Sequence, residues 1–243
     1  MKLLSSLPFL ILSLLAPGQT PKPSPGPAAP GRSGSRLLVV LDLAAALARH
    51  LAENGMEVRL TRDSDAFVPL WDRARLANEA GADLFISLHL NAAPTRKAKG
   101  SEVFFLTLGS GDREAESIAA LENAGGRRQP DPDNVIAGIL DDLSQKAYLV
   151  DSERLAVAIQ GQLNLLGGIR QRGVKQAPFV VLRGAAMPAV LVETAFISNQ
   201  KEEAKLKDPR FLQKVAQAIT RGVRLYFASG AGTPRRRAAA GAR

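Results

Sequence analysis

The chain has 243 residues, enough for one α/β domain with flanking segments, and its hydrophobic share of 46% is ordinary for a globular protein. The formal net charge of +9 predicts attraction to polyanions such as nucleic acid, anionic lipid or an acidic cell-wall polymer, without choosing among them. Cysteine is missing, which excludes disulfides, a lipid-modified N-terminal cysteine and thiolate chemistry, so a metal site must use histidines and carboxylates.

The N-terminal residues are typical of a secretory signal peptide. Lys2 supplies a positive charge, Leu3 to Leu15 form an apolar run interrupted only by Ser and Pro, and Ala16-Pro17-Gly18 offers small residues before a cleavage point. The run is short for a membrane span, which takes about 20 apolar residues, so an uncleaved anchor is the alternative. We therefore predict cleavage after Gly18, export to the periplasm or cell envelope, and no stable membrane insertion after cleavage.

Composition divides the chain into four expected segments. A stretch rich in Pro, Gly, Ser and Ala is typical of a flexible linker, and the run Arg235-Arg236-Arg237 near the C-terminus is typical of a solvated, disordered tail. The expected segments are a signal peptide (1–18), a flexible linker (19–35), a folded catalytic domain (36–228) and a basic disordered tail (229–243).

Hydrophobic periodicity predicts alternating strands and helices in the folded domain. The run Leu37 to Leu41 is ambiguous between a short buried strand and the start of a helix, and helical spacing then continues to Asn54-Gly55. Strands are expected over 56–60, 82–90, 102–106, 179–182 and 189–193, and further helices over 70–80, 112–123, 134–148, about 151–166 and 209–227. Such alternation favours an α/β domain of three layers (α/β/α), with helices on both faces of the sheet.

The chain holds only two histidines, and they differ in context. His50 lies near the end of a predicted helix beside Arg49, where a surface histidine interacting with the helix dipole explains it. His89 ends an apolar strand and is followed by a loop of small residues. Strand ends that open into loops are where α/β folds place ligands and catalytic groups. A core histidine bonded to backbone would give the same pattern, so both interpretations of His89 stay open.

Glu193 ends the apolar run Pro188-Ala-Val-Leu-Val. A buried carboxylate there costs several kcal/mol unless it is paired, metal-bound or protonated. Glu193 is therefore either a structural ion-pair partner, for which Lys175 is a candidate, or a catalytic acid/base with a raised pKa.

Four segments together carry a family resemblance. In order and spacing they are similar to the zinc-dependent N-acetylmuramoyl-L-alanine amidases of bacteria, over roughly residues 40 to 227. The segments are LTRDSDAFVPLWDRARLAN (60–78), ADLFISLHLNAAP (82–94), GSEVFFL (100–106) and GVKQAPFVVLRGAAMPAVLVETAFISNQKEE (173–203).

The resemblance implies a mixed, mostly parallel sheet flanked by helices. It also implies hydrolysis of the amide that joins N-acetylmuramic acid to L-alanine in peptidoglycan, in cell-wall turnover or daughter-cell separation. A zinc ion held by two His and one Glu would polarise the carbonyl, and a second Glu would act as general base. His89 takes the position of the second metal histidine, and Glu193 that of the catalytic glutamate. The implied partners are peptidoglycan and an activator protein, with no nucleic acid.

The chain departs from the family at the other two zinc ligands. The family's first strand runs into a Gly-His-Gly-Gly motif, and a Glu-Lys pair precedes the first helix. If Leu38 to Asp42 is that strand, the loop with both ligands is deleted; if Leu37 to Asp42 is helical, the ligand Glu falls on Arg36. Asp42 is the candidate substitute, His50 a poor one, and no third protein ligand is expected near His89 and Glu193. The alternative function is therefore an impaired member that binds peptidoglycan without cleaving it.

The helical segment 112–148 is expected to lie at the periphery of the domain. A further hypothesis is that it covers the active-site groove as a lid.

Overall fold

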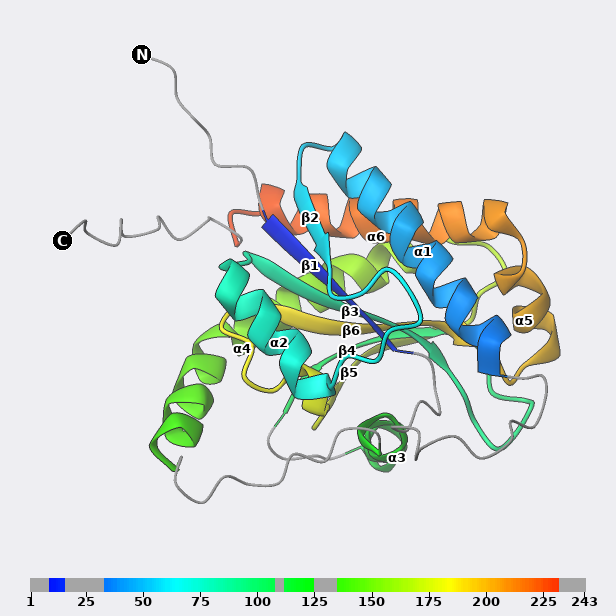
Figure 1. Ribbon diagram of the computed structural model, residues 1–243. Helices are drawn as coiled ribbons and strands as arrows, with labels where there is room; N and C mark the ends of the chain where they lie inside the picture. The colour runs from blue at the N-terminus through cyan, green and yellow to red at the C-terminus, as the bar shows by residue number, and fades with distance from the viewer. Residues whose placement is uncertain (1–8, 16–32, 108–111, 125–134, 232–243) are drawn as a thin grey trace, which may run out of the picture.

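The computed structural model describes residues 9–15, 33–107, 112–124 and 135–231 (Figure 1). The predicted cleavage point at Gly18, the linker up to residue 32, the loop 125–133 and the tail from residue 232 lie outside the described residues.

A six-stranded sheet with the order β2-β1-β3-β6-β4-β5 forms the middle of the molecule. Neighbouring strands run parallel except β4 and β6, which pair antiparallel. The expectation of a mixed, mostly parallel sheet is therefore confirmed. The strands, in chain order, are β1 (Phe9–Leu15), β2 (Glu57–Leu60), β3 (Leu84–Asn91), β4 (Ser101–Leu106), β5 (Gln171–Ala177) and β6 (Ala189–Phe196).

Helices cover both faces of this sheet, so the predicted three-layer fold is also confirmed (Figure 1). Helices α1 (Ser33–Glu53), α4 (Val135–Leu163) and α6 (Pro209–Ala228) pack on one face and share one hydrophobic core with the sheet. Helices α2 (Leu70–Ala80) and α3 (Arg113–Asn123) and the short 3-10 turn η1 (Val180–Leu182) enclose a second core on the other face. The short helix α5 (Gln200–Leu206) connects β6 to α6.

Strands β3 and β6 are buried along their whole length because helices lie on both sides of them. Successive side chains of β3 therefore enter opposite cores: Ile86 and Leu88 enter the one beneath α1 and α6, and Phe85 enters the one beneath α2. This double burial is the reason for the nearly continuous apolar run that predicted the strand. It also means that a polar side chain in either strand is removed from water.

The expected start of the folded domain at residue 36 is wrong. Residues Phe9–Leu15, interpreted as part of a signal peptide, form β1 and pair in parallel with β2 on one side and β3 on the other. A short apolar run has the same composition in a signal peptide as in a parallel strand buried on both faces, so sequence does not separate them. Cleavage after Gly18 stays a prediction, and it would remove this strand from the sheet.

Helix α1 resolves the ambiguity over residues 37–42, which lie inside the helix. The alternative that placed the first strand there is wrong, and the helical alternative is confirmed. Val40, Leu43, Leu47 and Leu51 recur every three or four residues and are fully buried against the sheet.

Three further elements differ from expectation. Helix α4 is continuous where two helices were predicted, and within it the Ser152 hydroxyl donates to the Tyr148 carbonyl at 2.8 Å. The strand expected over 179–182 is the turn η1, and β5 and α5 were not expected. Among the described helices, none has the length and apolar character needed to cross a membrane.

Candidate active site

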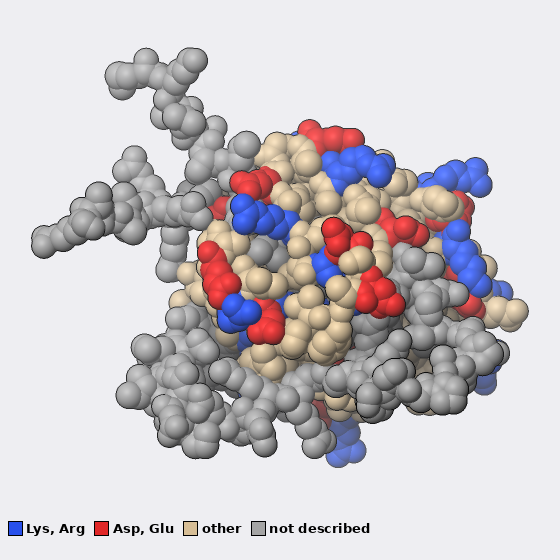
Figure 2. Space-filling model, in the orientation of Figure 1, with Lys and Arg blue, Asp and Glu red and all other residues tan. Residues whose placement is uncertain are grey.

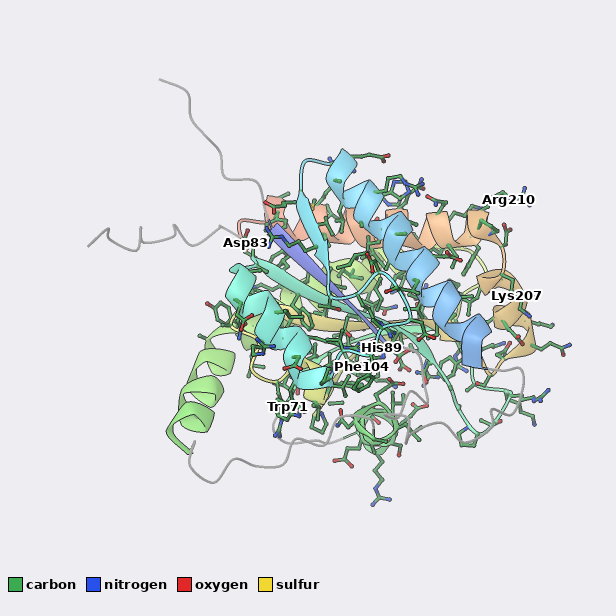
Figure 3. The ribbon with its side chains drawn as sticks, viewed as in Figure 1. Trp71, Asp83, His89, Phe104, Lys207 and Arg210 are labelled. Carbon is green, nitrogen blue, oxygen red and sulfur yellow. The ribbon has the colours of Figure 1, made fainter. Side chains whose placement is uncertain are left out.

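The candidate site lies where β3 and β6 end, at the carboxyl edge of the parallel strands. His89 of β3 is aligned with Glu193 of β6, and Leu15 of β1 is aligned with His89 on the other side. Figure 3 shows His89 near the middle of the molecule, close to Phe104 and on the side of the sheet that faces α3. The two residues singled out from the sequence therefore meet, as the family resemblance implies.

His89 is fully buried and has a partner at each ring nitrogen. Nε2 lies 2.8 Å from the Ser87 hydroxyl oxygen, and Nδ1 lies 3.0 Å from Oε2 of Glu122. Ser87 and His89 are two residues apart in β3, so their side chains leave the same face of the strand. These two contacts fix the orientation of the imidazole ring.

Glu122 is a site residue that the sequence interpretation missed, and the expectation of no third ligand near His89 is wrong. It lies at the end of α3, which begins at the N-cap Asp112 and buries Ala115, Ile118 and Ala119. Glu122 continues this buried stripe at the next helical position and is only 7% exposed. A carboxylate at an apolar position of an amphipathic helix was the available signal.

Glu193 is the most unusual group in the site. It is fully buried, neither of its side-chain oxygens has a hydrogen-bond partner among the described residues, and Oε1 lies 3.8 Å from Nδ1 of His89. Burial raises the pKa of Glu193 well above its ordinary value, and the charges of Glu122 and Glu102 raise it further. Among the described residues, no Lys or Arg pairs with Glu193, so the structural ion-pair interpretation lacks a lysine or arginine partner.

Lys175 was the expected ion-pair partner of Glu193, and this expectation is wrong. Its ammonium group lies 2.9 Å from Oε2 of Glu102 and 3.1 Å from Oε2 of Glu114. Glu102 stands opposite Glu193 in the antiparallel pairing of β4 and β6, and its Oε1 accepts a hydrogen bond of 2.8 Å from Asn91. Two buried carboxylates therefore lie side by side, and of the two only Glu102 pairs with lysine or arginine side chains of the described residues.

The residues present suit a metal ion. His89, Glu122 and Glu193 each offer a ligand atom, and these atoms lie within 4.8 Å of one another. One imidazole and two carboxylates are donors that zinc accepts, and the unpartnered oxygens of buried Glu193 are what a cation would satisfy. The substitutes considered from the sequence lie elsewhere: Asp42 is exposed on α1, and His50 lies 2.8 Å from the side-chain oxygen of Gln213 and 3.2 Å from Glu53.

The position of β1 also changes the account of the two remaining family ligands. The interpretation that their loop is deleted is wrong, because residues 16–32 separate β1 from α1. The chain leaves β1 at Leu15, level with His89, and continues as Ala16-Pro17-Gly18-Gln19. Because Gly18-Gln19 follows β1 as Gly-His follows the family's first strand, we infer that Gln19 takes the place of that histidine and that Arg36 in α1 takes the place of the family's glutamate. Residues 16–32 contain no His, Asp or Glu.

Comparison with known proteins agrees with this geometry. The family model described as N-acetylmuramoyl-L-alanine amidase (Amidase_3) matches residues 17–224. The chain is 38% identical over 203 residues to N-acetylmuramoyl-L-alanine amidase AmiA of Escherichia coli (strain K12), covering 81% of this chain and 70% of AmiA.

Solved structures show the same fold. An N-acetylmuramoyl-L-alanine amidase from Clostridium difficile 630 matches with a TM-score of 0.63 at 25% identity, covering 93% of this chain and 99% of that one. The CwlD amidase from Clostridioides difficile, solved in complex with the GerS lipoprotein, matches with a TM-score of 0.62 at 20% identity over 91% of this chain and 99% of that one.

Proposed function

The chain belongs to the N-acetylmuramoyl-L-alanine amidase family, and we propose that it hydrolyses the amide bond between N-acetylmuramic acid and L-alanine in peptidoglycan. The observation that carries this proposal is Glu193, a fully buried carboxyl group with two unpartnered oxygens beside His89. A group in this state is ready to exchange a proton with a reacting water or amide nitrogen. The role in the cell is cell-wall turnover or daughter-cell separation.

Glu193 is the acid/base of the proposed reaction. Its raised pKa lets the carboxylate take a proton from the attacking water and return it to the departing amine of L-alanine. His89 would hold a zinc ion, the usual metal of this family, and Glu122 would be an additional ligand while α3 covers the site. When bound, the ion would supply Lewis-acid polarisation of the scissile carbonyl. Ser87 keeps the imidazole of His89 in place through the contact at Nε2.

Helix α3 lies over the site and must move before a substrate can reach Glu193. Glu122 of α3 contacts the His89 ring directly, and Glu193 beneath it has no exposed surface. We therefore assign α3 the part of a lid whose displacement opens the site, in agreement with the expectation for segment 112–148.

Localisation and partners follow from the substrate. Peptidoglycan lies outside the cytoplasm, so the protein is exported and acts in the periplasm or cell envelope. An activator protein that displaces α3 would give this lid a trigger, and the complex of the CwlD amidase with a lipoprotein supports such a partner.

Digestion of purified peptidoglycan by the full-length protein with added zinc tests the proposal. Release of stem peptides with a new N-terminal L-alanine, detected by mass spectrometry, is expected. Glu193→Gln should lower the rate by about 10²–10⁴-fold, since it removes proton transfer. The matched control is Glu79→Gln, an exposed glutamate of α2 that pairs with Arg75 at the surface. Sedimentation with peptidoglycan and no released peptide would instead support the alternative of a binder that does not cleave.

A further inference from the structure

Two cations on β5, Arg172 and Lys175, converge on a buried carboxylate next to the site. Nε of Arg172 lies 3.1 Å and Nζ of Lys175 lies 2.9 Å from the same Oε2 of Glu102, which is fully buried. The two cations are themselves only 11% and 15% exposed at their side chains. They are held far more firmly than ordinary surface lysines and arginines.

A β-bulge explains why both side chains face the same way. Residues three apart in a regular strand point to opposite faces, but the pairing of β4 with β5 shifts between Ser101 and Val103. Between these positions β5 advances from Gln171 to Val174, so it holds one residue more than β4. Gly173, with a positive φ of 86°, lies in this stretch. The ring of Phe196 lies 5.1 Å below the guanidinium carbon of Arg172 and supports it from the other side.

The charges of this group do not balance within the sheet. Glu102 supplies one negative charge against two positive ones, and within the part of the chain that the structure describes the second positive charge is paired by Glu114 of α3 and its N-cap Asp112. Glu114 contacts both cations, at 2.5 Å from Arg172 and 3.1 Å from Lys175, and Asp112 lies 3.8 Å from Lys175. Glu114 and Asp112 are 57% and 45% exposed at their side chains, so the residues that balance the charge come from the part that must move away (Figure 1).

We propose that Arg172 and Lys175 form the binding site for a carboxylate of the substrate's peptide, and that Glu114 occupies this site while α3 covers it. Glu102 of β4 is the cross-strand neighbour of Glu193 of β6, so the cation pair on β5 lies two strands from the reacting group. In a peptide that begins L-alanyl-D-glutamate and runs from the scissile amide across β4 towards β5, the glutamate carboxylate would reach the two cations. A bidentate guanidinium and an ammonium are suited to a carboxylate. The proposal rests on the proposed function, because the amide at Glu193 sets where the peptide begins.

Binding of short peptides, measured by calorimetry on the full-length protein, tests the proposal independently of catalysis. The probes are L-alanyl-D-glutamate and the same peptide with every carboxylate replaced by a carboxamide. Glu114→Gln should tighten binding of the acidic peptide by about tenfold and leave the carboxamide peptide unchanged, because it removes the competing carboxylate. Glu114 is exposed, so this variant does not disturb the core.

Lys175→Gln should weaken binding of the acidic peptide by about tenfold, because it removes one charge-assisted hydrogen bond. In the hydrolysis of peptidoglycan, the same variant should raise KM more than it lowers kcat. The single variant removes one of the two cations that pair with buried Glu102, which could disturb folding. The double variant Glu102→Gln/Lys175→Gln removes the buried anion together with the cation and therefore controls for that effect. Lys207→Gln, an exposed lysine that pairs only with Glu203 and is labelled in Figure 3, is the matched control.

Equal affinity of the wild type for acidic and carboxamide peptides, or no response to Glu114→Gln, overturns the proposal. Acidic-peptide selectivity without release of stem peptides from peptidoglycan leaves this binding site standing and counts against the amidase function alone.

Discussion

At the carboxyl edge of the sheet, the β3 and β6 side and the β1 and α1 side differ in the number of active-site residues that they carry. On the β3 and β6 side, His89 and Glu193 are aligned, fully buried and joined by Glu122. On the β1 and α1 side, the strand and helix are in place, but the chain has Gln19 and Arg36 where the resembling family has zinc ligands.

This difference indicates that the pairing of β1 in the sheet does not depend on the presence of metal-ligating residues after the strand. β1 is held by backbone hydrogen bonds to β2 and β3, and α1 by its apolar stripe, and neither contribution depends on which residue follows the strand. The fold therefore persists on the side whose ligands have changed. Figure 2 shows acidic and basic side chains interspersed over the described part of one face.

Removing residues 1–18 should have the largest effect. It takes out β1 and leaves β2 without its neighbour, so most of the unfolding free energy, typically about 5–15 kcal/mol for a domain, should be lost. Urea denaturation followed by circular dichroism measures it. The control lacks residues 232–243, which supply none of the described strands or helices. A truncated protein as stable as the full chain would show that β1 is dispensable and that cleavage after Gly18 is compatible with the fold.

Restoring the family ligands should have the next largest effect. The apparent free energy of zinc binding to a full ligand set is about 10–16 kcal/mol. Each restored ligand should therefore contribute roughly 3 kcal/mol of binding free energy, or about a hundredfold in affinity. Gln19→His with Arg36→Glu should therefore bind zinc far more tightly than the wild type, in a competition titration against a chromophoric chelator. Arg49→Glu, an exposed arginine of the same helix, controls for the change of charge. No gain in affinity would refute our placement of Gln19 and Arg36.

Within the β3 and β6 side, the lid should be less stable than the strands it covers. Helix α3 docks through few apolar residues, whereas β3 is buried throughout, so amides of 113–123 should exchange faster than those of 84–91 by more than about tenfold. Hydrogen exchange with mass spectrometry compares the two peptides in one sample. Equal protection would contradict the lid assignment.

Acid should loosen the lid by a small amount. The hydrogen bond from Lys175, and with it that from Arg172, outweighs partial desolvation and lowers the pKa of Glu114. The stabilisation is therefore present above the ordinary glutamate pKa of 4.5 and is lost as pH falls through the lower folded value. The change should stay below about 1 kcal/mol because Glu114 is exposed to solvent. After correction for intrinsic rates, α3 exchange should rise at low pH in the wild type and not in Glu114→Gln.

The sequence by itself determined the three-layer fold, β3, β6, α2 and α6, and its family resemblance implied the meeting of His89 with Glu193. Those elements are long, periodic and apolar, and each of the two residues is a polar side chain at the end of a buried run, which is local information.

Only the tertiary structure decided which segment fills the place of β1, which carboxylate reaches His89, and which partner Lys175 takes. Each of these depends on contacts between residues far apart in the chain. The contacts are the parallel pairing of Phe9–Leu15 with β3, the approach of Glu122 from α3 to His89, and the β-bulge at Gly173. Composition and spacing do not determine such contacts. An apolar run, or a glutamate in an amphipathic helix, is compatible with several environments, and only the packing of the whole chain selects one of them.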